Sequence, residues 1–127
     1  MILADSDVLI EILDKKSKRG DEAIKRILES GTEVCTTVIN IHEVLFGLYK
    51  YGKSVKEILQ LPIFEYTKKD ALLSSRLELE AEKNGTPLHR TDAMIGAIAI
   101  NNGASLYTFD LKHFASLKNQ GLKIFPE

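Results

Sequence analysis

Short apolar runs alternate along this chain with longer segments in which apolar residues recur every three to four positions. The short runs predict β-strands, and the longer periodic segments predict amphipathic helices. Strands that alternate with helices favour a parallel sheet, because each helix returns the chain to the edge where the next strand begins. We therefore expect an α/β fold, a three-layer α/β/α sandwich around a central, mostly parallel sheet of about five short strands.

The expected elements form one domain over residues 1–127. Strands are expected at 2–4, 33–37, 63–66, 105–108 and 122–125. Helices are expected at 7–16, 21–30, 38–52, 54–61, 68–83 and 91–102. Thr91 or Asp92 is expected to cap the last of these helices, which is apolar nearly all round and should be buried.

The charge balance argues against a protein that coats nucleic acid. The chain has 17 basic and 18 acidic residues, so any contact with nucleic acid should be local and brief, as in an enzyme. A single cysteine, Cys35, cannot form an internal disulfide, which favours a reducing cytoplasm. We expect no membrane span and no secretory signal, because the longest apolar stretches are short and two acids interrupt the N-terminal one.

Four acidic residues lie in apolar surroundings. Asp5 directly follows the first expected strand, and Asp110 follows the strand at 105–108. Asp92 begins a helix that leads into a strand, and Glu43 lies two turns into the helix after 33–37. Since ligands gather at the carboxyl ends of parallel strands, we expect these side chains to converge at one sheet edge. Glu43, the only acid among the apolar residues of its helix, is the hardest of the four to explain as surface.

Converging carboxylates repel one another, and some would be protonated at neutral pH without a compensating cation. An oxygen-only ligand set without a cysteine or histidine cluster favours Mg²⁺ or Mn²⁺ over zinc. One or two such ions can polarise a phosphate and activate water. Hydrolysis of a phosphodiester bond is therefore the predicted chemistry.

Each acid also has a purely structural interpretation. Asp5 or Asp7 could cap the following helix, and for Asp7 this interpretation is preferred. Asp92 could be only a helix cap, and Asp110 could begin a turn. Glu43 could pair with Asn40, with His42 or with a lysine from elsewhere. The shared sheet edge, not any single acid, carries the metal-site hypothesis.

Four segments, "ILADSDVLIEIL", "VINIHEVLFGL", "RTDAMIGAIAI" and "LYTFDLKHF", resemble in order the acidic motifs of PIN-domain ribonucleases. Within that superfamily they look most like VapC-type toxins of toxin–antitoxin pairs. The resemblance spans nearly the whole chain and implies a PIN-like fold. It also implies Mg²⁺- or Mn²⁺-dependent hydrolysis of single-stranded RNA, with in-line attack by water that leaves a 3′-hydroxyl and a 5′-phosphate.

By this resemblance Asp5, Asp92 and Asp110 carry metal, directly or through water. Glu43 binds a second metal or orients the attacking water, so all four acids are expected to be catalytic. Thr108 matches the small hydroxyl residue that precedes the last acid, and it is expected to contact metal-bound water or the scissile phosphate.

Further residues are expected around these acids. Ser6 matches a small polar position of the family, and Asp7 stands where asparagine is common, so both are expected near the metal or the substrate. Possible RNA contacts are Arg90, Lys112 and His113, which adjoin two of the acids in sequence. The dense basic run "KKSKRG", expected in the loop after the first helix, is more typical of a solvated loop, and His42 and His89 are expected to be structural.

The resemblance also implies partners, namely a homodimer and a VapB-like antitoxin that occupies an apolar groove. Leu9, Ile10, Leu13 and Ile27 could line that groove, although for most of them the protein core is the preferred interpretation.

Two other functions remain open from the residues alone. The opening "ILADSDVL" also fits a haloacid-dehalogenase-like phosphatase, with Asp5 as nucleophile and Asp7 as general acid. That interpretation leaves Glu43 unexplained, and the further lysine and acid pair that it needs are not well placed. The other alternative is a PIN-like fold kept as a non-enzymatic interaction module.

Overall fold

The computed structural model describes residues 1–86 and 88–126. Its five strands form one sheet in the order β3-β2-β1-β4-β5, and every neighbouring pair is parallel. The strands are β1 (Ile2–Ala4), β2 (Val34–Thr37), β3 (Ile63–Phe64), β4 (Ser105–Tyr107) and β5 (Lys123–Phe125). The predicted α/β sandwich with a parallel sheet is thereby confirmed.

Helical segments fill the connections between the strands. They are α1 (Ser6–Leu9), the π-helical η1 (Ile10–Asp14), α2 (Lys18–Ser30), α3 (Val38–Lys50), α4 (Lys56–Leu59), α5 (Lys68–Lys83), α6 (Arg90–Asn101), α7 (Leu111–Phe114) and the 3₁₀-helical η2 (Ala115–Gln120). None of the helices described is long and apolar enough to cross a membrane.

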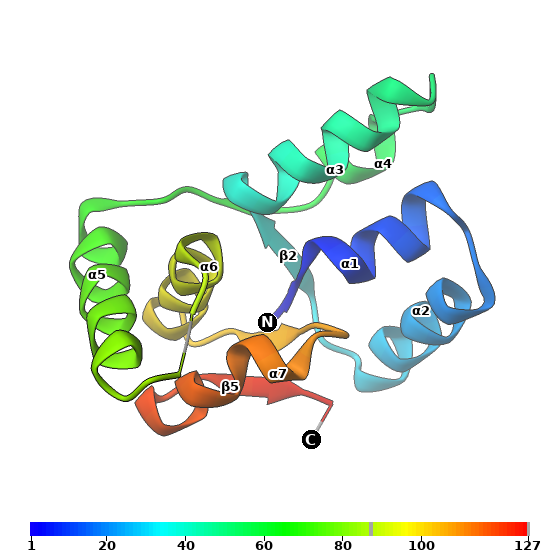
Figure 1. Ribbon diagram of the computed structural model, residues 1–127. Helices are drawn as coiled ribbons and strands as arrows, with labels where there is room; N and C mark the ends of the chain where they lie inside the picture. The colour runs from blue at the N-terminus through cyan, green and yellow to red at the C-terminus, as the bar shows by residue number, and fades with distance from the viewer. Residues whose placement is uncertain (87, 127) are drawn as a thin grey trace.

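The three layers follow from the alternation of side chains along each strand. Leu3 of β1 points into the core cluster formed with α5 and α6, whereas Ile2 and Ala4 on either side of it join the clusters formed with α1, α2 and α3. Figure 1 shows the result: α5 and α6 lie on one side of the strands, and α1 and α2 lie on the other. As predicted, α6 is largely buried.

Four helices, α1, α2, α4 and α6, start one to three residues away from the predicted positions, and the starts of α6 and α2 are the informative ones. Helix α6 begins at Arg90, and its N-cap residue is His89, which makes no side-chain capping hydrogen bond. The expectation that Thr91 or Asp92 caps this helix is therefore wrong. Helix α2 begins at Lys18 because the Ser17 side chain accepts a hydrogen bond from the Gly20 amide, so the basic run is partly helical.

The backbone of α2 at Gly20 lies against the backbone of η1. This close approach explains why a glycine occupies a position inside the helix. A Cβ atom at this position would lie 2.2 Å from the carbonyl oxygen of Glu11 in η1. A glycine that disfavours the helix locally therefore permits the tertiary contact between α2 and η1.

The apolar residues considered for a partner groove are largely core. Leu9 is 3% exposed within the cluster of α1, α3 and α4, and Ile10 and Leu13 pack partly buried against it. Ile27 is partly buried against the cluster of α1 and α2. For Leu9 the core interpretation is confirmed.

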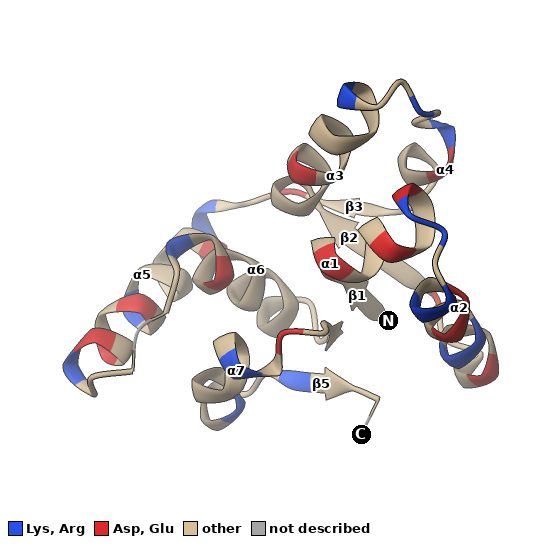
Figure 2. Cartoon of the chain, turned by 45° about the vertical axis from the view of Figure 1, so that its right-hand side comes forward, with Lys and Arg blue, Asp and Glu red and all other residues tan. Residues whose placement is uncertain are grey.

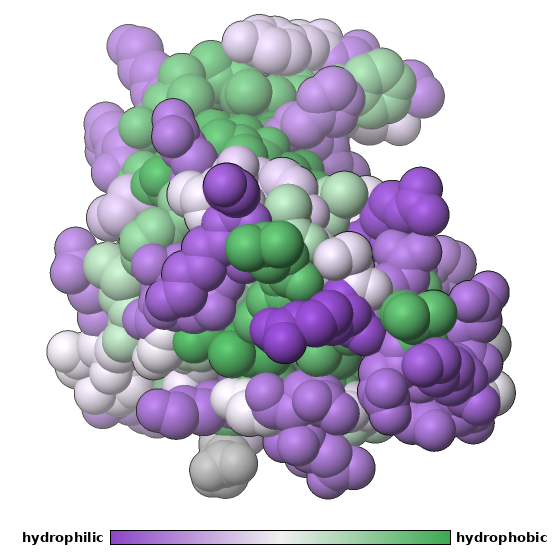
Figure 3. Space-filling view, turned by 90° about the vertical axis from the view of Figure 1, so that its left-hand side faces the viewer, coloured by the Kyte–Doolittle hydropathy of each residue, from purple (hydrophilic) through white to green (hydrophobic). Residues whose placement is uncertain are grey.

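Exposed apolar residues lie elsewhere, on α3 and α5. Leu72 and Leu79, two turns apart on α5, are 60% and 50% exposed, and Phe46 on α3 is 66% exposed. Figure 3, which looks onto the α5 side, shows apolar areas interspersed with hydrophilic ones.

The strand order creates a crevice at one sheet edge. From β1 the chain passes to β2 and β3 on one side and then returns to β4 and β5 on the other. In open parallel sheets, ligands bind where the order reverses, at the carboxyl ends of the strands. Asp5 follows β1 and Thr108 follows β4 at this reversal, and the Asp5 amide donates to the carbonyl of Tyr107 at 2.9 Å.

Candidate active site

A cavity of about 890 Å³ opens at this edge of the sheet. It brings together most of the predicted site residues. Those that line it are Asp5, Ser6, Asp7, Glu43, Asp92, Asp110 and His113. Thr108, Arg90 and Lys112 are not among its lining residues. The four acids expected to converge thus share one cavity, although they come from four separate parts of the chain.

Asp5 is the most enclosed of these acids, at 8% exposed. One carboxylate oxygen accepts hydrogen bonds from the Ser6 amide and from the Asn40 side chain, each at 2.9 Å. The other accepts a hydrogen bond from the Thr108 hydroxyl at 2.8 Å. Burial raises the pKa of the Asp5 carboxyl above its ordinary value, while these hydrogen bonds act in the opposite direction.

Asn40 is a site residue that the sequence analysis did not identify. It is fully buried on α3, where its amide group donates to both Asp5 and the Ser6 hydroxyl at 2.9 Å. Its carbonyl oxygen in turn accepts from the Thr37 hydroxyl at 2.7 Å. One sequence signal could have identified it. Asn40 lies four positions before Val44, so both side chains fall on the face of α3 that meets the core, where a polar residue is unusual.

Asp7 does not cap the first helix, so the preferred structural interpretation of this residue is wrong. The N-cap is Asp5, and Asp7 lies in the first turn. Its carboxylate accepts from the Val8 amide at 2.8 Å and from the Phe109 amide at 3.1 Å, so it joins the start of α1 to the segment after β4. Burial and the charge of Asp5 raise the pKa of Asp7 to about 6.

Thr108 connects two of the acids that line the cavity. Its hydroxyl donates to Asp5 and accepts a hydrogen bond from the Asp110 amide at 3.0 Å. The side chain is buried, at 4% exposed, so it holds Asp5 and Asp110 in place.

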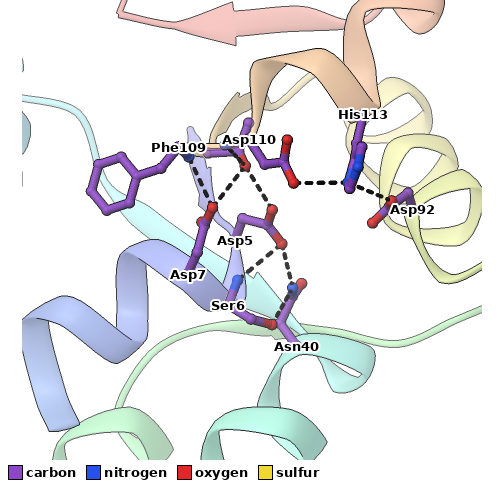
Figure 4. A network of polar contacts seen from close by, with 9 residues as sticks. Asp5, Ser6, Asp7, Asn40, Asp92, Phe109, Asp110 and His113 are labelled. Carbon is purple, nitrogen blue, oxygen red and sulfur yellow. Dashed lines mark hydrogen bonds and ion pairs between the residues drawn. The ribbon is translucent and has the colours of Figure 1, made fainter. Parts of the chain in front are cut away.

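Asp92 and Asp110 face each other across His113, which lies on α7. The His113 Nδ1 atom is 2.8 Å from an Asp110 oxygen and 3.7 Å from an Asp92 oxygen (Figure 4). Burial raises the pKa of Asp92, and the charge of Asp5 acts in the same direction, whereas His113 and His89 act to lower it. Asp5 and Asp92 are therefore neighbouring carboxylates that disfavour each other's charge.

Glu43 lines the cavity but is exposed, so the argument from its apolar surroundings is wrong. Helix α3 buries Asn40, Val44 and Leu48, which lie four residues apart, and Glu43 falls on the neighbouring face beside exposed His42. The helical period, rather than the composition of the segment, decides which side chains are buried.

The predicted cationic contacts are divided between separate places. Arg90 pairs with Glu78 of α5 through two hydrogen bonds of 3.0 and 3.1 Å and lines a different cavity. Arg90 is therefore held in an ion pair with Glu78, away from the cavity that the acids line. Lys112 is exposed on α7, next to His113.

The donor chemistry of the cavity fits a hard divalent cation. Asp5, Asp92 and Asp110 offer carboxylate oxygens, and within residues 1–86 and 88–126 no lysine or arginine forms an ion pair with any of them. In the same residues, however, no three acidic, histidine or cysteine side chains are grouped so that they could hold a metal ion as they stand. The residues thus supply the ligand types in one cavity, with His113 between two of them.

The structure is similar to chains of several solved structures, one of which is described as a toxin–antitoxin complex. A chain in the complex of VapBC2 from Rickettsia felis, bound to a promoter DNA fragment, has a TM-score of 0.79 and 20% identity, with 98% of this chain and 97% of that chain covered. A chain of FitAcB from Neisseria gonorrhoeae has the same TM-score and identity, with 98% and 96% covered. A chain of a toxin–antitoxin complex from Klebsiella pneumoniae is 27% identical, with a TM-score of 0.75 and 91% of each chain covered. No curated protein matches the chain.

The sequence itself matches one family profile, described as the PIN domain, over residues 2–119. Members of this family are typically nucleases, and they generally use divalent metals. The four acidic motifs predicted a PIN-domain protein, and this prediction is therefore confirmed. The haloacid-dehalogenase-like alternative has no support. Because the match covers most of its length, the chain belongs to the PIN domain family.

Proposed function

We propose that this protein is a metal-dependent endoribonuclease that hydrolyses phosphodiester bonds in single-stranded RNA. The observation that carries the proposal is the cavity at the strand-order reversal, which is lined by the four predicted acids and by Asp7 in a PIN-domain chain. Of the chemistries open to such a carboxylate cavity, phosphodiester hydrolysis with a divalent cation is the best fit.

Asp5, Asp92 and Asp110 would hold the cation, which is Mg²⁺ or Mn²⁺ by the hardness of its ligands, and Glu43 would serve a second ion or the attacking water. When bound, such an ion stabilises negative charge on the phosphate and lowers the pKa of water. His113 contacts only one oxygen of Asp92 and one of Asp110, so the second oxygen of each carboxylate would remain available to a cation.

The protein's own residues would prepare this site before substrate arrives. Asn40 and Thr108 fix the orientation of the Asp5 carboxylate, and each donates to a different oxygen. Glu43, exposed at the cavity, is free to accept a proton from the attacking water. In-line attack then breaks the bond to the 3′-oxygen and leaves a 3′-hydroxyl and a 5′-phosphate.

Cleavage of labelled RNA tests the proposal. Purified wild-type protein should cut single-stranded RNA internally in Mg²⁺ or Mn²⁺ and should stop when EDTA is added. Asp5→Asn and Asp92→Asn should each lower the cleavage rate by about a thousandfold or more, because each removes a charged ligand. Asp21→Asn, which neutralises an exposed acid on α2, is the matched control and should cleave normally.

Full RNA cleavage by a purified Asp92→Asn protein would contradict the assignment, as would wild-type cleavage that persists in EDTA. If the wild type does not cleave RNA in any metal, the non-enzymatic interaction module becomes the better description. Mapping the termini of the products checks the direction of bond breakage independently.

We further propose that the chain is the toxin of a VapBC-type pair, with a VapB-like antitoxin as its inhibitor and a homodimer as its own assembly. The support is its likeness to chains in VapBC2, FitAcB and the Klebsiella toxin–antitoxin complex. Expression of the wild type alone should arrest growth of a host, whereas Asp92→Asn should not. Sedimentation of the purified chain tests the dimer, and a monomer at all concentrations would contradict it.

A further inference from the structure

The basic run of residues 15–19 is a dense charged segment that the proposed site leaves unused. It contains Lys15, Lys16, Lys18 and Arg19, and Figure 2 shows these basic residues between the end of the first helical segment and the start of α2. Arg19 is the member with a defined tertiary contact: its guanidinium carbon lies 3.8 Å from the centre of the Phe109 ring.

The donors of Arg19 remain available to a ligand. Its side chain is exposed, and within the two described ranges no carboxylate lies at ion-pair distance from it. By contrast, Lys15 pairs with Glu11 and Arg26 pairs with Glu22. A guanidinium stacked on an aromatic ring has a fixed plane, and its N–H groups point outward from the edge of that plane, where they can bind a phosphate.

The Phe109 ring that positions Arg19 belongs to the segment that builds the active site. Phe109 lies between Thr108 and Asp110, and its amide donates to Asp7 at 3.1 Å (Figure 4). Through Phe109, the guanidinium of Arg19 is therefore held in a defined position relative to the carboxylates.

Two smaller cavities on the surface are lined by Arg19 and Phe109. A side cavity of about 380 Å³ shares Asp7 and Asp110 with the main cavity and is also lined by Lys15, Arg19 and Phe109. A third hollow of about 410 Å³ shares Arg19 and Phe109 with the side cavity. The side cavity thus adjoins the carboxylates, and the Arg19–Phe109 pair borders both it and the hollow on the surface of α2.

We propose that the side cavity is a subsite for a phosphate of single-stranded RNA next to the scissile bond, with Arg19 as the residue that binds it. The proposal rests on the proposed ribonuclease function, because a strand cut in the main cavity must continue beyond it. An RNA backbone that crosses a rim of carboxylates needs a cation to offset their repulsion. Arg19 is a preorganised cation that lines the side cavity together with two of these carboxylates, Asp7 and Asp110.

Binding of a fluorescein-labelled, mixed-sequence single-stranded RNA tests the subsite. Anisotropy titrations in EDTA keep the RNA intact. Arg19→Gln should raise Kd about tenfold, because a charge-assisted phosphate contact is lost. The slope of log K against log salt should shrink by about 0.7, the value for one phosphate contact on a single strand. Arg19→Lys should restore the slope and only part of the affinity, because lysine keeps the charge but not the planar donors.

Lys25→Gln is the matched control, because Lys25 is an exposed cation on the same helix and lines none of the three hollows. It should leave Kd within about twofold of the wild type. Thermal melting of each variant reports whether Arg19 acts only by packing on Phe109, because a packing role lowers Tm without changing the salt slope.

The subsite would be overturned if the wild type did not bind RNA, or if Arg19→Gln and Lys25→Gln lost equal RNA affinity. It would also be overturned if Arg19→Gln left the salt slope unchanged, or if it left the RNA affinity unchanged. The last would assign the exposed guanidinium to packing or to a protein partner. Arg19-dependent binding without cleavage in any metal would instead remove the ribonuclease function and retain the subsite. RNA cleavage by the wild type, combined with RNA binding that does not depend on Arg19, would retain the ribonuclease function and remove the subsite.

Discussion

Asn40 has hydrogen bonds that reach well beyond its own helix. Its amide nitrogen donates to Asp5 and Ser6, and its carbonyl oxygen accepts from Thr37, so it joins the start of α1 to the start of α3. A buried amide with all its partners in place holds those partners in one arrangement. The orientation of Asp5, an acid proposed to bind metal, therefore depends on a neutral residue from another element.

Asn40→Ala should destabilise the protein and impair the site together. We expect the free energy of unfolding to fall by about 1 to 3 kcal/mol, because the Asp5 and Thr37 groups lose their buried partner. RNA cleavage should fall about 10- to 100-fold, as is usual when a residue that orients a metal ligand is removed. Urea denaturation and cleavage kinetics measure the two effects. Asn119→Ala, at an exposed position, should change neither, and normal cleavage by Asn40→Ala would contradict the positioning role.

Asp7 gives the stability of the metal-free protein a pH dependence with a definite sign. The pKa of its carboxyl rises from 3.8 to about 6 on folding, so the folded state holds the proton more tightly than the unfolded state. Its contribution to stability is therefore fully present below pH 3.8 and is lost as the pH rises through about 6. Because solvent screens part of this effect, the loss is on the order of 1 to 2 kcal/mol.

Asp7→Asn should remove this dependence. In EDTA the variant should be more stable than the wild type at pH 7 and about equal to it near pH 4, because asparagine is neutral at both values. Burial raises the pKa of Asp5 and Asp92 in the same direction, so both proteins retain a residual slope. The difference between their unfolding free energies, measured in urea at several pH values, isolates Asp7. A difference that does not change with pH would refute the prediction.

At the scale of elements, the packing of helices depends on a few close contacts between them. Gly20 lets α2 lie against the carbonyl of Glu11 in η1. On the opposite side of the sheet, Asp70 of α5 accepts a hydrogen bond from Asn101 of α6 at 2.8 Å, and it also forms a capping box with Thr67. Helix α2 carries Arg19, so its seating on η1 also sets where that guanidinium lies.

Gly20→Ala should push α2 away from η1. Alanine is the better helix former, so an isolated helix would gain about 1 kcal/mol. In the protein we expect a net loss of about 1 to 3 kcal/mol, because the added methyl group collides with backbone that cannot rotate away. Thermal or urea unfolding distinguishes the two signs. Glu29→Ala, at an exposed position on α2, should show only the small effect of helix propensity. A stabilised Gly20→Ala protein would show that the close approach is absent.

At the scale of the whole molecule, the parallel sheet assembles the site. Strand β1 pairs with both β2 and β4, so the segments that follow these strands open onto one edge. The acids there share a cavity in which burial and mutual repulsion raise the pKa of Asp5 and of Asp92. A cation bound only by the folded chain would relieve that repulsion.

Divalent cations should therefore stabilise the fold, independently of any catalysis. At a concentration of one hundred times Kd, Mg²⁺ or Mn²⁺ should contribute about 2.7 kcal/mol and raise Tm by on the order of 10 °C. EDTA should return Tm to the metal-free value. Asp92→Asn should lose most of the shift, whereas Asp21→Asn should keep it. Equal shifts in these two variants would mean that the ions bind outside the cavity.

Much of the fold and the outline of the site could be predicted from the sequence. Strand and helix order follow from local periodicity, and the rule for parallel sheets places Asp5, Asp92 and Asp110 at one edge. Asn40 and the joining role of Asp7 could not be predicted in this way, because their hydrogen-bond partners lie about 35 to 100 positions away in sequence. The same holds for the pairing of Arg90 with Glu78, which joins two neighbouring helices.

The sequence by itself determined the order of elements, the class of fold and which four acids were expected to share one cavity. Those features depend on residue type and spacing, which act locally along the chain. Only the tertiary structure decided that Glu43 is exposed, that α2 runs through Gly20 and that Arg19 rests on Phe109. Each of these depends on how close two distant backbones come, and packing settles that distance only when all the layers are in place.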